Sequence, residues 1–157
     1  MASNGIAGEF FVAAELTKRG MIATITGKNT KDIDIIAANP NNGKTVLVQV
    51  KEKSLNNKSP EWVLGAVKDT QINMDVWYIF VDLANYECHI ISARELAPII
   101  QKRQDDYNHG FNKNGKPRRP ETTRFYFNRN KDILDANGNV KVNNWEDLPI
   151  FNCGDAQ

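Results

Sequence analysis

Residues 31–53 (KDIDIIAANPNNGKTVLVQVKEK) constrain the fold of this chain more than any other stretch. Two runs rich in β-branched residues flank the sequence Pro-Asn-Asn-Gly at 40–43, whose residue types favour a tight turn. The stretch therefore predicts a β-hairpin. Side chains alternate between the two faces of a strand, so each run has one apolar and one polar face.

The alternation brings polar side chains together at one end of the predicted hairpin. On the first run Asp32 and Asp34 share a face, and the isoleucines at 33 and 35 take the other. On the second run the polar face carries three side chains: Gln49, Lys51 and Lys53. The hairpin alone leaves two interpretations open, a functional cluster or the solvated face of an amphipathic hairpin.

The length of 157 residues, with 41% hydrophobic and 25% charged side chains, predicts one globular domain over residues 1–157. We expect a core over about 4–105 and a basic loop, a strand and a closing helix over about 106–157. No apolar run reaches the roughly 18 residues of a membrane span. The N-terminus lacks a secretory pattern and the two cysteines are far apart, so we expect a cytoplasmic protein with no membrane partner.

The stretch before the hairpin predicts a helix over 4–19, capped by Ser3 or Asn4 and ended by Gly20, and then a strand over 21–26.

Glu9 is the unusual residue of that helix, because apolar residues or glycine occupy the positions three and four residues away on both sides. A carboxylate within an apolar stripe costs free energy unless something satisfies it. Glu9 is therefore either a residue at a helix boundary or a carboxylate at the edge of a site.

Behind the hairpin, apolar runs and turn signals predict further elements. They are a helix over 60–69, strands over 76–83 and 87–91, a capping box at 92–95, a helix to about 105, an aromatic strand over 124–128 and a short helix over 143–148.

The stretch 101–131 is strongly basic, with nine Lys or Arg and three Asp or Glu side chains, although the whole chain has a net charge of only +1. Basic side chains with aromatic neighbours suit a phosphate backbone and exposed bases, whereas a solvated loop is the alternative. The predicted nucleic-acid contacts are Lys28, Lys31, Lys53, Lys113, Lys116, Arg118, Arg119 and Arg124.

Three segments, GEFFVAAELTKRG, DIDIIA and VLVQVK, resemble the PD-(D/E)xK nuclease superfamily of restriction-endonuclease-like proteins. The spacing is most similar to Holliday-junction resolvases and to small bacterial and homing endonucleases in which Gln-x-Lys replaces acid-x-Lys. The resemblance covers residues 5–53. It implies an α/β fold with an αβββαβ core, in which helices flank a mixed central sheet.

The resemblance also implies roles for individual residues. Glu9 would be the helix acid, Asp34 the central metal-ligand carboxylate, Lys51 the catalytic lysine, and Gln49 would replace the second acid. Glu9, Asp34 and Gln49 would then hold Mg²⁺ or Mn²⁺ through oxygen, with Asp32 as a possible additional carboxylate. The chain departs from the pattern because no proline adjoins Asp34 and because Gln49 is neutral.

The implied activity is that of a metal-dependent endonuclease that hydrolyses phosphodiester bonds in DNA, with RNA as an alternative substrate. A homodimer or higher homo-oligomer is expected, since cutting both strands requires two active sites. The alternative function is a catalytically weak or inactive nuclease fold that binds nucleic acid or a protein.

Overall fold

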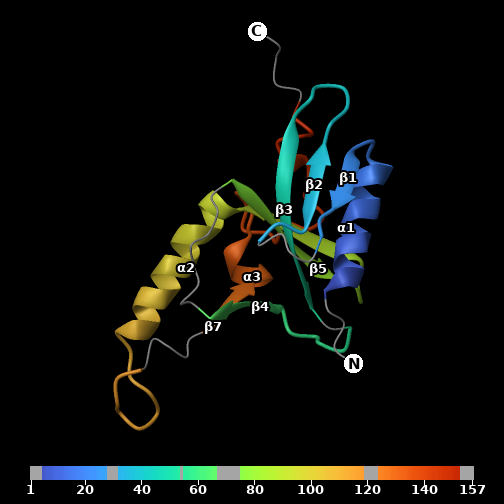
Figure 1. Ribbon diagram of the computed structural model, residues 1–157. Helices are drawn as coiled ribbons and strands as arrows, with labels where there is room; N and C mark the ends of the chain where they lie inside the picture. Colours follow the sequence, from blue (N-terminus) through green and yellow to red (C-terminus); the bar gives the residue numbers. More distant parts are fainter. Residues whose placement is uncertain (1–4, 28–31, 54, 67–74, 119–123, 153–157) are drawn as a thin grey trace.

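The computed structural model describes residues 5–27, 32–53, 55–66, 75–118 and 124–152, without the side chains of residues 65, 66, 124 and 125. The chain has the predicted α/β class, with a five-stranded mixed sheet and a separate two-stranded sheet (Figure 1). In chain order the described elements are α1 (Ile6–Lys18), β1 (Ile22–Ile25), β2 (Ile35–Ala38), β3 (Thr45–Lys53), β4 (Glu61–Ala66), β5 (Val76–Asp82), β6 (Glu87–Ser92), α2 (Ala93–Asn108), β7 (Arg124–Asn128), α3 (Arg129–Asp132) and the 3-10 turn η3 (Trp145–Asp147).

The central sheet has the strand order β1-β2-β3-β5-β6. Its neighbours are antiparallel except for β3 and β5, which run parallel from the pair Leu47 and Val76 to the pair Lys53 and Asp82. The long hairpin is thus joined to the rest of the sheet through β3, the strand that carries the Gln-x-Lys sequence.

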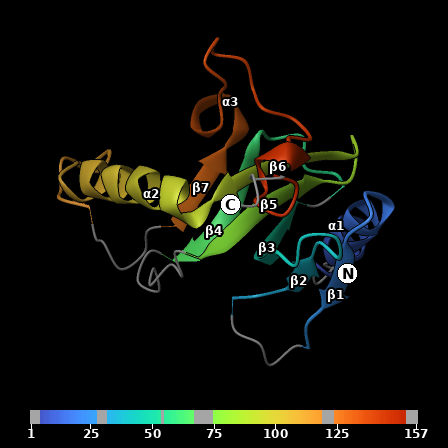
Figure 2. The same cartoon turned by 90° about the horizontal axis from the view of Figure 1, so that it is seen from above.

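The two long helices pack on opposite faces of this sheet, as Figure 2 shows from above. Val12 and Leu16 of α1 are fully buried in one apolar cluster with the inner face of the hairpin. Leu96 and Ile100 of α2 belong to a second cluster, on the other face of the sheet. We call these two faces the α1 face and the α2 face.

The predicted hairpin is confirmed. Ile35 of β2 pairs with Val48 of β3, and Gly43 has the positive φ of 69° that the turn requires. The valines at 46, 48 and 50 are buried on the α1 face. Gln49, Lys51 and Lys53 therefore project to the α2 face, as the alternation predicts.

The predicted helix over 60–69 is wrong, because residues 61–66 form β4, which pairs antiparallel with β7. Trp62 accounts for the difference, since a strand lets it face Phe127 across the pair while the indole Nε1–H donates to the Val81 carbonyl oxygen at 3.0 Å. The described part of the β3–β5 connection is therefore a strand rather than the helix of an αβββαβ core. Residues 67–74 lie outside the described residues.

The helix ends follow the sequence in part. The residue before α1 is Gly5, with φ of 76°, and the predicted caps Ser3 and Asn4 lie outside the described residues. Gly20 ends this region with φ of 84°, as predicted. The capping box of α2, between Ser92 and Glu95, is confirmed.

The later elements agree with the sequence in place more than in length. Helix α2 continues to Asn108, beyond the predicted end near 105. The aromatic strand over 124–128 is confirmed as β7. The closing helix predicted over 143–148 is only the 3-10 turn η3.

Candidate active site

Asp34 lies immediately before β2 and is held in the plane of the sheet. Its backbone N–H donates to the Val48 carbonyl oxygen at 2.8 Å, and its carboxylate Oδ2 accepts the backbone N–H of Val50 at 2.7 Å. The side chain thus extends the β2–β3 ladder by one position and is half-buried. One carboxylate oxygen is used by the sheet, and Oδ1 has no hydrogen-bond partner among the described residues.

The residues before Asp34 do not follow the predicted alternation. Asp32 is exposed and has φ of 63°, a left-handed conformation that Asp tolerates better than most residues. Ile33 packs against the cluster on the α2 face, whereas Ile35 belongs to the cluster on the α1 face. The expectation that Ile33 and Ile35 share a face is therefore wrong, because β2 begins only at Ile35 and the two residues before it are not part of the strand.

Gln49 and Lys51 project from β3 beside this carboxylate. Both side chains are half-buried, and they lie next to Tyr78 and Phe80 of the parallel strand β5. The amide of Val50, to which Asp34 binds, lies between them in the chain. Within the described part of the chain, neither side chain forms a hydrogen bond or an ion pair. Among the described residues Lys51 is therefore a half-buried side chain without a counter-charge.

Glu9 of α1 approaches the same place from the other side of β3. Its side chain is half-buried, and burial raises the pKa of its carboxyl above the ordinary value. The negative charges of Asp34 and Glu52 raise this pKa further. Glu9 and Asp34, which the sequence predicts as partners, are thus electrostatically coupled in the fold.

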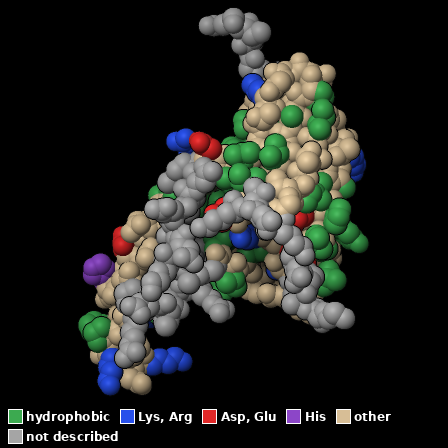
Figure 3. Space-filling view, viewed as in Figure 1, with side chains coloured by type: hydrophobic (Ala, Val, Ile, Leu, Met, Phe, Trp, Pro, Cys, Tyr) green, Lys and Arg blue, Asp and Glu red, His purple; other side chains and the backbone are tan. Residues whose placement is uncertain are grey.

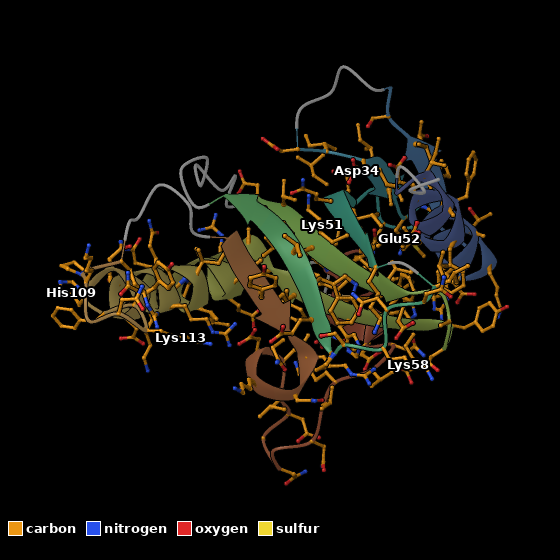
Figure 4. All side chains as sticks on the ribbon, turned by 90° about the horizontal axis from the view of Figure 1, so that it is seen from below. Asp34, Lys51, Glu52, Lys58, His109 and Lys113 are labelled. Atoms are coloured by element: carbon orange, nitrogen blue, oxygen red, sulfur yellow. The ribbon has the colours of Figure 1, made fainter. Side chains whose placement is uncertain are left out.

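Glu52 explains how α1 is positioned. It lies on the opposite side of β3 from Lys51, as the alternation predicts, and faces α1 (Figure 4). Its Oε2 accepts the backbone N–H of Gly8 at 2.7 Å, which satisfies one of the free donors in the first turn of the helix. A Cβ at Gly8 would lie 3.1 Å from the Cβ of Glu52, so glycine permits this close approach. The contact places Glu9, the next residue, at the edge of β3.

Tyr78 is a site neighbour that sequence reasoning missed. Its side chain is only 8% exposed. Burial raises the pKa of its hydroxyl, and the charges of Asp32 and Asp34 raise it further. The residue lies within an apolar run of β5, and only the parallel register, which pairs it with Gln49, brings it to the site.

Lys53 is not available to a phosphate, contrary to the prediction from sequence. Its side chain is 4% exposed, and Nζ lies 2.7 Å from Oδ2 of Asp82. The ammonium also donates to the Ser59 carbonyl oxygen at 2.9 Å and lies 4.7 Å from the centre of the Trp62 ring. Lys53 therefore has a structural role.

The other predicted nucleic-acid contacts differ in their surroundings. Lys113 and Lys116 are exposed in the loop after α2. Arg118 is half-buried in the same loop. Three predicted residues, Lys28, Lys31 and Arg119, lie outside the described residues, and of Arg124 only the backbone in β7 is described.

The predicted donor set supplies the atom type that a hard divalent cation prefers, but few carboxylates. Within the described ranges, no three His, Cys, Asp or Glu side chains lie close enough together to hold a metal ion. The set expected from sequence has two carboxylates, Glu9 and Asp34, and the amide oxygen of Gln49. All three supply oxygen, the atom that Mg²⁺ and Mn²⁺ prefer. The mutual repulsion that raises the pKa of Glu9 would fall if a cation bound between these carboxylates.

Comparisons with protein-family models, curated proteins and solved structures find no match to the chain. No helix in the described part of the chain is long and apolar enough to cross a membrane. The interpretation of the site therefore depends on its geometry and on the sequence motifs.

Proposed function

We propose that the protein is a divalent-metal-dependent endonuclease that hydrolyses phosphodiester bonds in DNA. One observation carries the proposal. Glu9 and Asp34 are electrostatically coupled, and Asp34 binds the backbone of β3 next to Lys51. Lys51 has no counter-ion among the described residues. A carboxylate pair beside an available ammonium suits a reaction in which negative charge develops on phosphate oxygens.

The proposed roles are those that the sequence resemblance implies, and the positions of the residues support them. A bound Mg²⁺ or Mn²⁺ would lower the pKa of a water nucleophile and neutralise charge on the phosphate. Asp34 would bind this ion through the carboxylate oxygen that Val50 does not use, and Glu9 and Gln49 would complete the oxygen set. Lys51 would donate to a phosphate oxygen and stabilise the charge that builds up there.

Cleavage of a substrate panel tests the proposal. Purified protein would be incubated with supercoiled plasmid, linear duplex, single strand, four-way junction and RNA, in Mg²⁺, Mn²⁺ or EDTA. We expect metal-dependent cleavage of DNA that Asp34→Asn and Lys51→Ala abolish. Asp34→Asn is the sharper variant, because its amide oxygen can still accept the Val50 N–H while the charge is lost.

Lys58→Ala is the matched control, since Lys58 is an exposed lysine in the loop after β3 (Figure 4). The control should cleave at the wild-type rate. Cleavage by folded Asp34→Asn and Lys51→Ala at that same rate would remove these residues from the active site.

Analytical ultracentrifugation with a duplex substrate tests the proposed homodimer, because one chain supplies one site.

The lack of a free carboxylate beside Lys51 on the described part of β3 favours a second function. Gln49 is neutral, and Glu52 is already bound to the Gly8 amide, so neither supplies the second carboxylate of a nuclease pair. With two carboxylates the chain would hold a cation weakly and would serve as a nucleic-acid-binding module of nuclease fold.

Cleavage by Gln49→Glu and DNA binding by the wild type together separate these two functions. In an endonuclease the added carboxylate should lower the Mg²⁺ concentration that half-saturates cleavage. In a binding module the wild-type chain should bind DNA in a salt-sensitive manner without cutting it. Binding that does not change with salt would argue against the module.

A further inference from the structure

An arm projects from the body of the protein, formed by α2 and the loop over 109–118 (Figures 1 and 4). Helix α2 has 16 residues and is therefore about 24 Å long. That length corresponds to about seven nucleotide steps of roughly 3.4 Å. Figure 4 shows Lys113 and His109 at the far end of the arm from Asp34 and Lys51.

The loop at the end of the arm is closed by its own hydrogen bonds. The Arg118 N–H donates to the Gly110 carbonyl oxygen at 3.1 Å, and Phe111 and Pro117 form an isolated bridge. The Asn112 N–H donates to the Lys116 carbonyl oxygen at 2.8 Å. The loop is thus a small hairpin that holds its side chains in defined positions.

Arginines of the arm are used to build it. The Arg118 guanidinium lies 4.5 Å from the centre of the Tyr107 ring, and its Nε–H donates to the Phe111 carbonyl oxygen at 3.1 Å. Arg103 forms an ion pair with Asp132 and donates to the Tyr126 carbonyl oxygen at 2.7 Å, which fixes α2 to the small sheet. Arg118 and Arg103 therefore hold the arm in shape.

The loop nevertheless presents an apolar ring to solvent. Phe111 is 63% exposed, although it lies on a hairpin whose backbone is hydrogen-bonded. Lys113 and Lys116 are exposed on the same hairpin. In Figure 3 basic, hydrophobic and histidine side chains occur together at the end of this arm.

We propose that the end of the arm, Phe111 with Lys113 and Lys116, binds an unpaired base and its adjoining phosphates. The proposal rests on the proposed action on DNA and adds its preferred substrate structure, DNA with single-stranded segments. An exposed ring offers a stacking surface to any base, and ammonium groups beside it attract the phosphate backbone. In a blunt duplex the internal bases are stacked on both faces and only the two terminal pairs expose one, so the ring would gain little there.

The test measures binding in EDTA, so that it does not depend on cleavage. Fluorescence anisotropy would follow three labelled DNAs, a 20-nucleotide single strand, a blunt duplex and a duplex with a single-stranded overhang. Phe111→Ala should weaken binding to the single strand and the overhang by about 5- to 100-fold. Binding to the blunt duplex should change by less than about twofold, and Phe111→Trp should retain the wild-type affinity.

Two further variants separate stacking from other effects. Phe10→Ala removes a ring that is 61% exposed on α1, and it should leave binding unchanged. Replacing Lys113 and Lys116 with alanine should reduce the salt dependence of binding, which Phe111→Ala should not.

Three results would overturn the proposal. These are equal losses of single-strand and duplex binding in Phe111→Ala, no loss at all, or a change only in oligomeric state, which would make the ring a contact between copies. Wild-type cleavage together with unchanged binding by Phe111→Ala would remove this inference and leave the endonuclease. Binding that depends on the Phe111 ring, without any cleavage, would keep this inference and remove the endonuclease.

Discussion

Two lysines on the α2 face of β3, Lys51 and Lys53, lie two residues apart and have opposite surroundings. Lys53 is enclosed beneath β4, where Asp82, the Ser59 carbonyl and the Trp62 ring satisfy its ammonium. Lys51 is half-buried, and within the described residues it has no hydrogen bond or ion pair. The same strand therefore carries Lys53, which forms a buried ion pair with Asp82, and Lys51, which has no ion-pair partner among the described residues.

The difference distinguishes a lysine that stabilises the fold from one whose charge could serve a ligand. A buried charge persists in a fold when its partners offset the cost of removing it from water. Lys53 and Asp82 meet this condition through their own contacts. Lys51 and Asp34 retain capacity for a ligand, and this capacity is what a phosphate or a metal ion requires.

The largest expected effect is the loss of cleavage activity when Lys51 is replaced. Lys51→Met should lower the cleavage rate by about 10²- to 10³-fold, because a charge that stabilises the transition state is lost. The melting temperature should stay close to that of the wild type, since Lys51 has no partner among the described residues to lose. Single-turnover cleavage and calorimetry measure the two quantities. A parallel fall in both would make Lys51 structural and erase the contrast with Lys53.

The next effect is a loss of stability when the buried Lys53–Asp82 ion pair is broken. Lys53→Met leaves Asp82 as an unpaired buried charge and should lower the free energy of unfolding by about 3–5 kcal/mol. The double variant Lys53→Met, Asp82→Leu should recover most of this loss, because no buried charge remains. Urea unfolding of the wild type and the variants measures both. A single variant as stable as the wild type would contradict the role given to Lys53.

A smaller effect concerns acid. Burial raises the pKa of Asp82, but hydrogen bonds from Lys53, Asn85 and the Ala84 amide outweigh it and hold the pKa below its ordinary value of 3.8. The folded state therefore binds this proton less well than the unfolded state does. The contribution of Asp82 to stability is present above pH 3.8 and is lost as the pH falls through the lowered pKa. Urea midpoints between pH 6 and pH 3 should fall more steeply for the wild type than for Asp82→Asn, and parallel curves would contradict this.

The smallest effect is at Glu9, where the sign is opposite. Its raised pKa means that the folded state binds the proton better, so its favourable contribution is present at low pH and lost as the pH rises through that pKa. Glu9→Gln should therefore raise the melting temperature slightly at pH 7 in EDTA. Mg²⁺ at ten times its dissociation constant should stabilise the wild type by about 1.4 kcal/mol and Glu9→Gln by less. Equal Mg²⁺ shifts in the two proteins would exclude Glu9 from the metal site.

Local signals in the sequence predicted much of the fold. The hairpin, the capping box at Ser92 and the turn at Gly43 are each specified by neighbouring residues, and the structure contains them. The stretch 60–66 does not specify its own structure, because a short apolar run such as Trp-Val-Leu suits a helix or a strand equally. Its pairing with β7, some sixty residues later, decides the outcome.

The site was predictable where the chain itself brings residues together. Asp34, Gln49 and Lys51 belong to one hairpin, so alternation and register suffice to group them. Tyr78 depends on the parallel pairing of β3 with β5, which no local pattern specifies. The role of Lys53 depends in the same way on Asp82 of the neighbouring strand, so the sequence alone does not distinguish this buried lysine from a phosphate contact.

The bond between Glu52 and the Gly8 amide has a consequence for the order of folding. The residue before α1 is Gly5, which has no side chain with which to cap the helix, and a carboxylate 44 residues away accepts the Gly8 N–H. The first turn of α1 should therefore gain its stability only after β3 has formed and docked. Folding kinetics of Glu52→Gln and Gly8 variants should then show that this turn is ordered late. Glu9 reaches its place in the same step, so the candidate active site and the native packing of the N-terminal helix would form as one cooperative event.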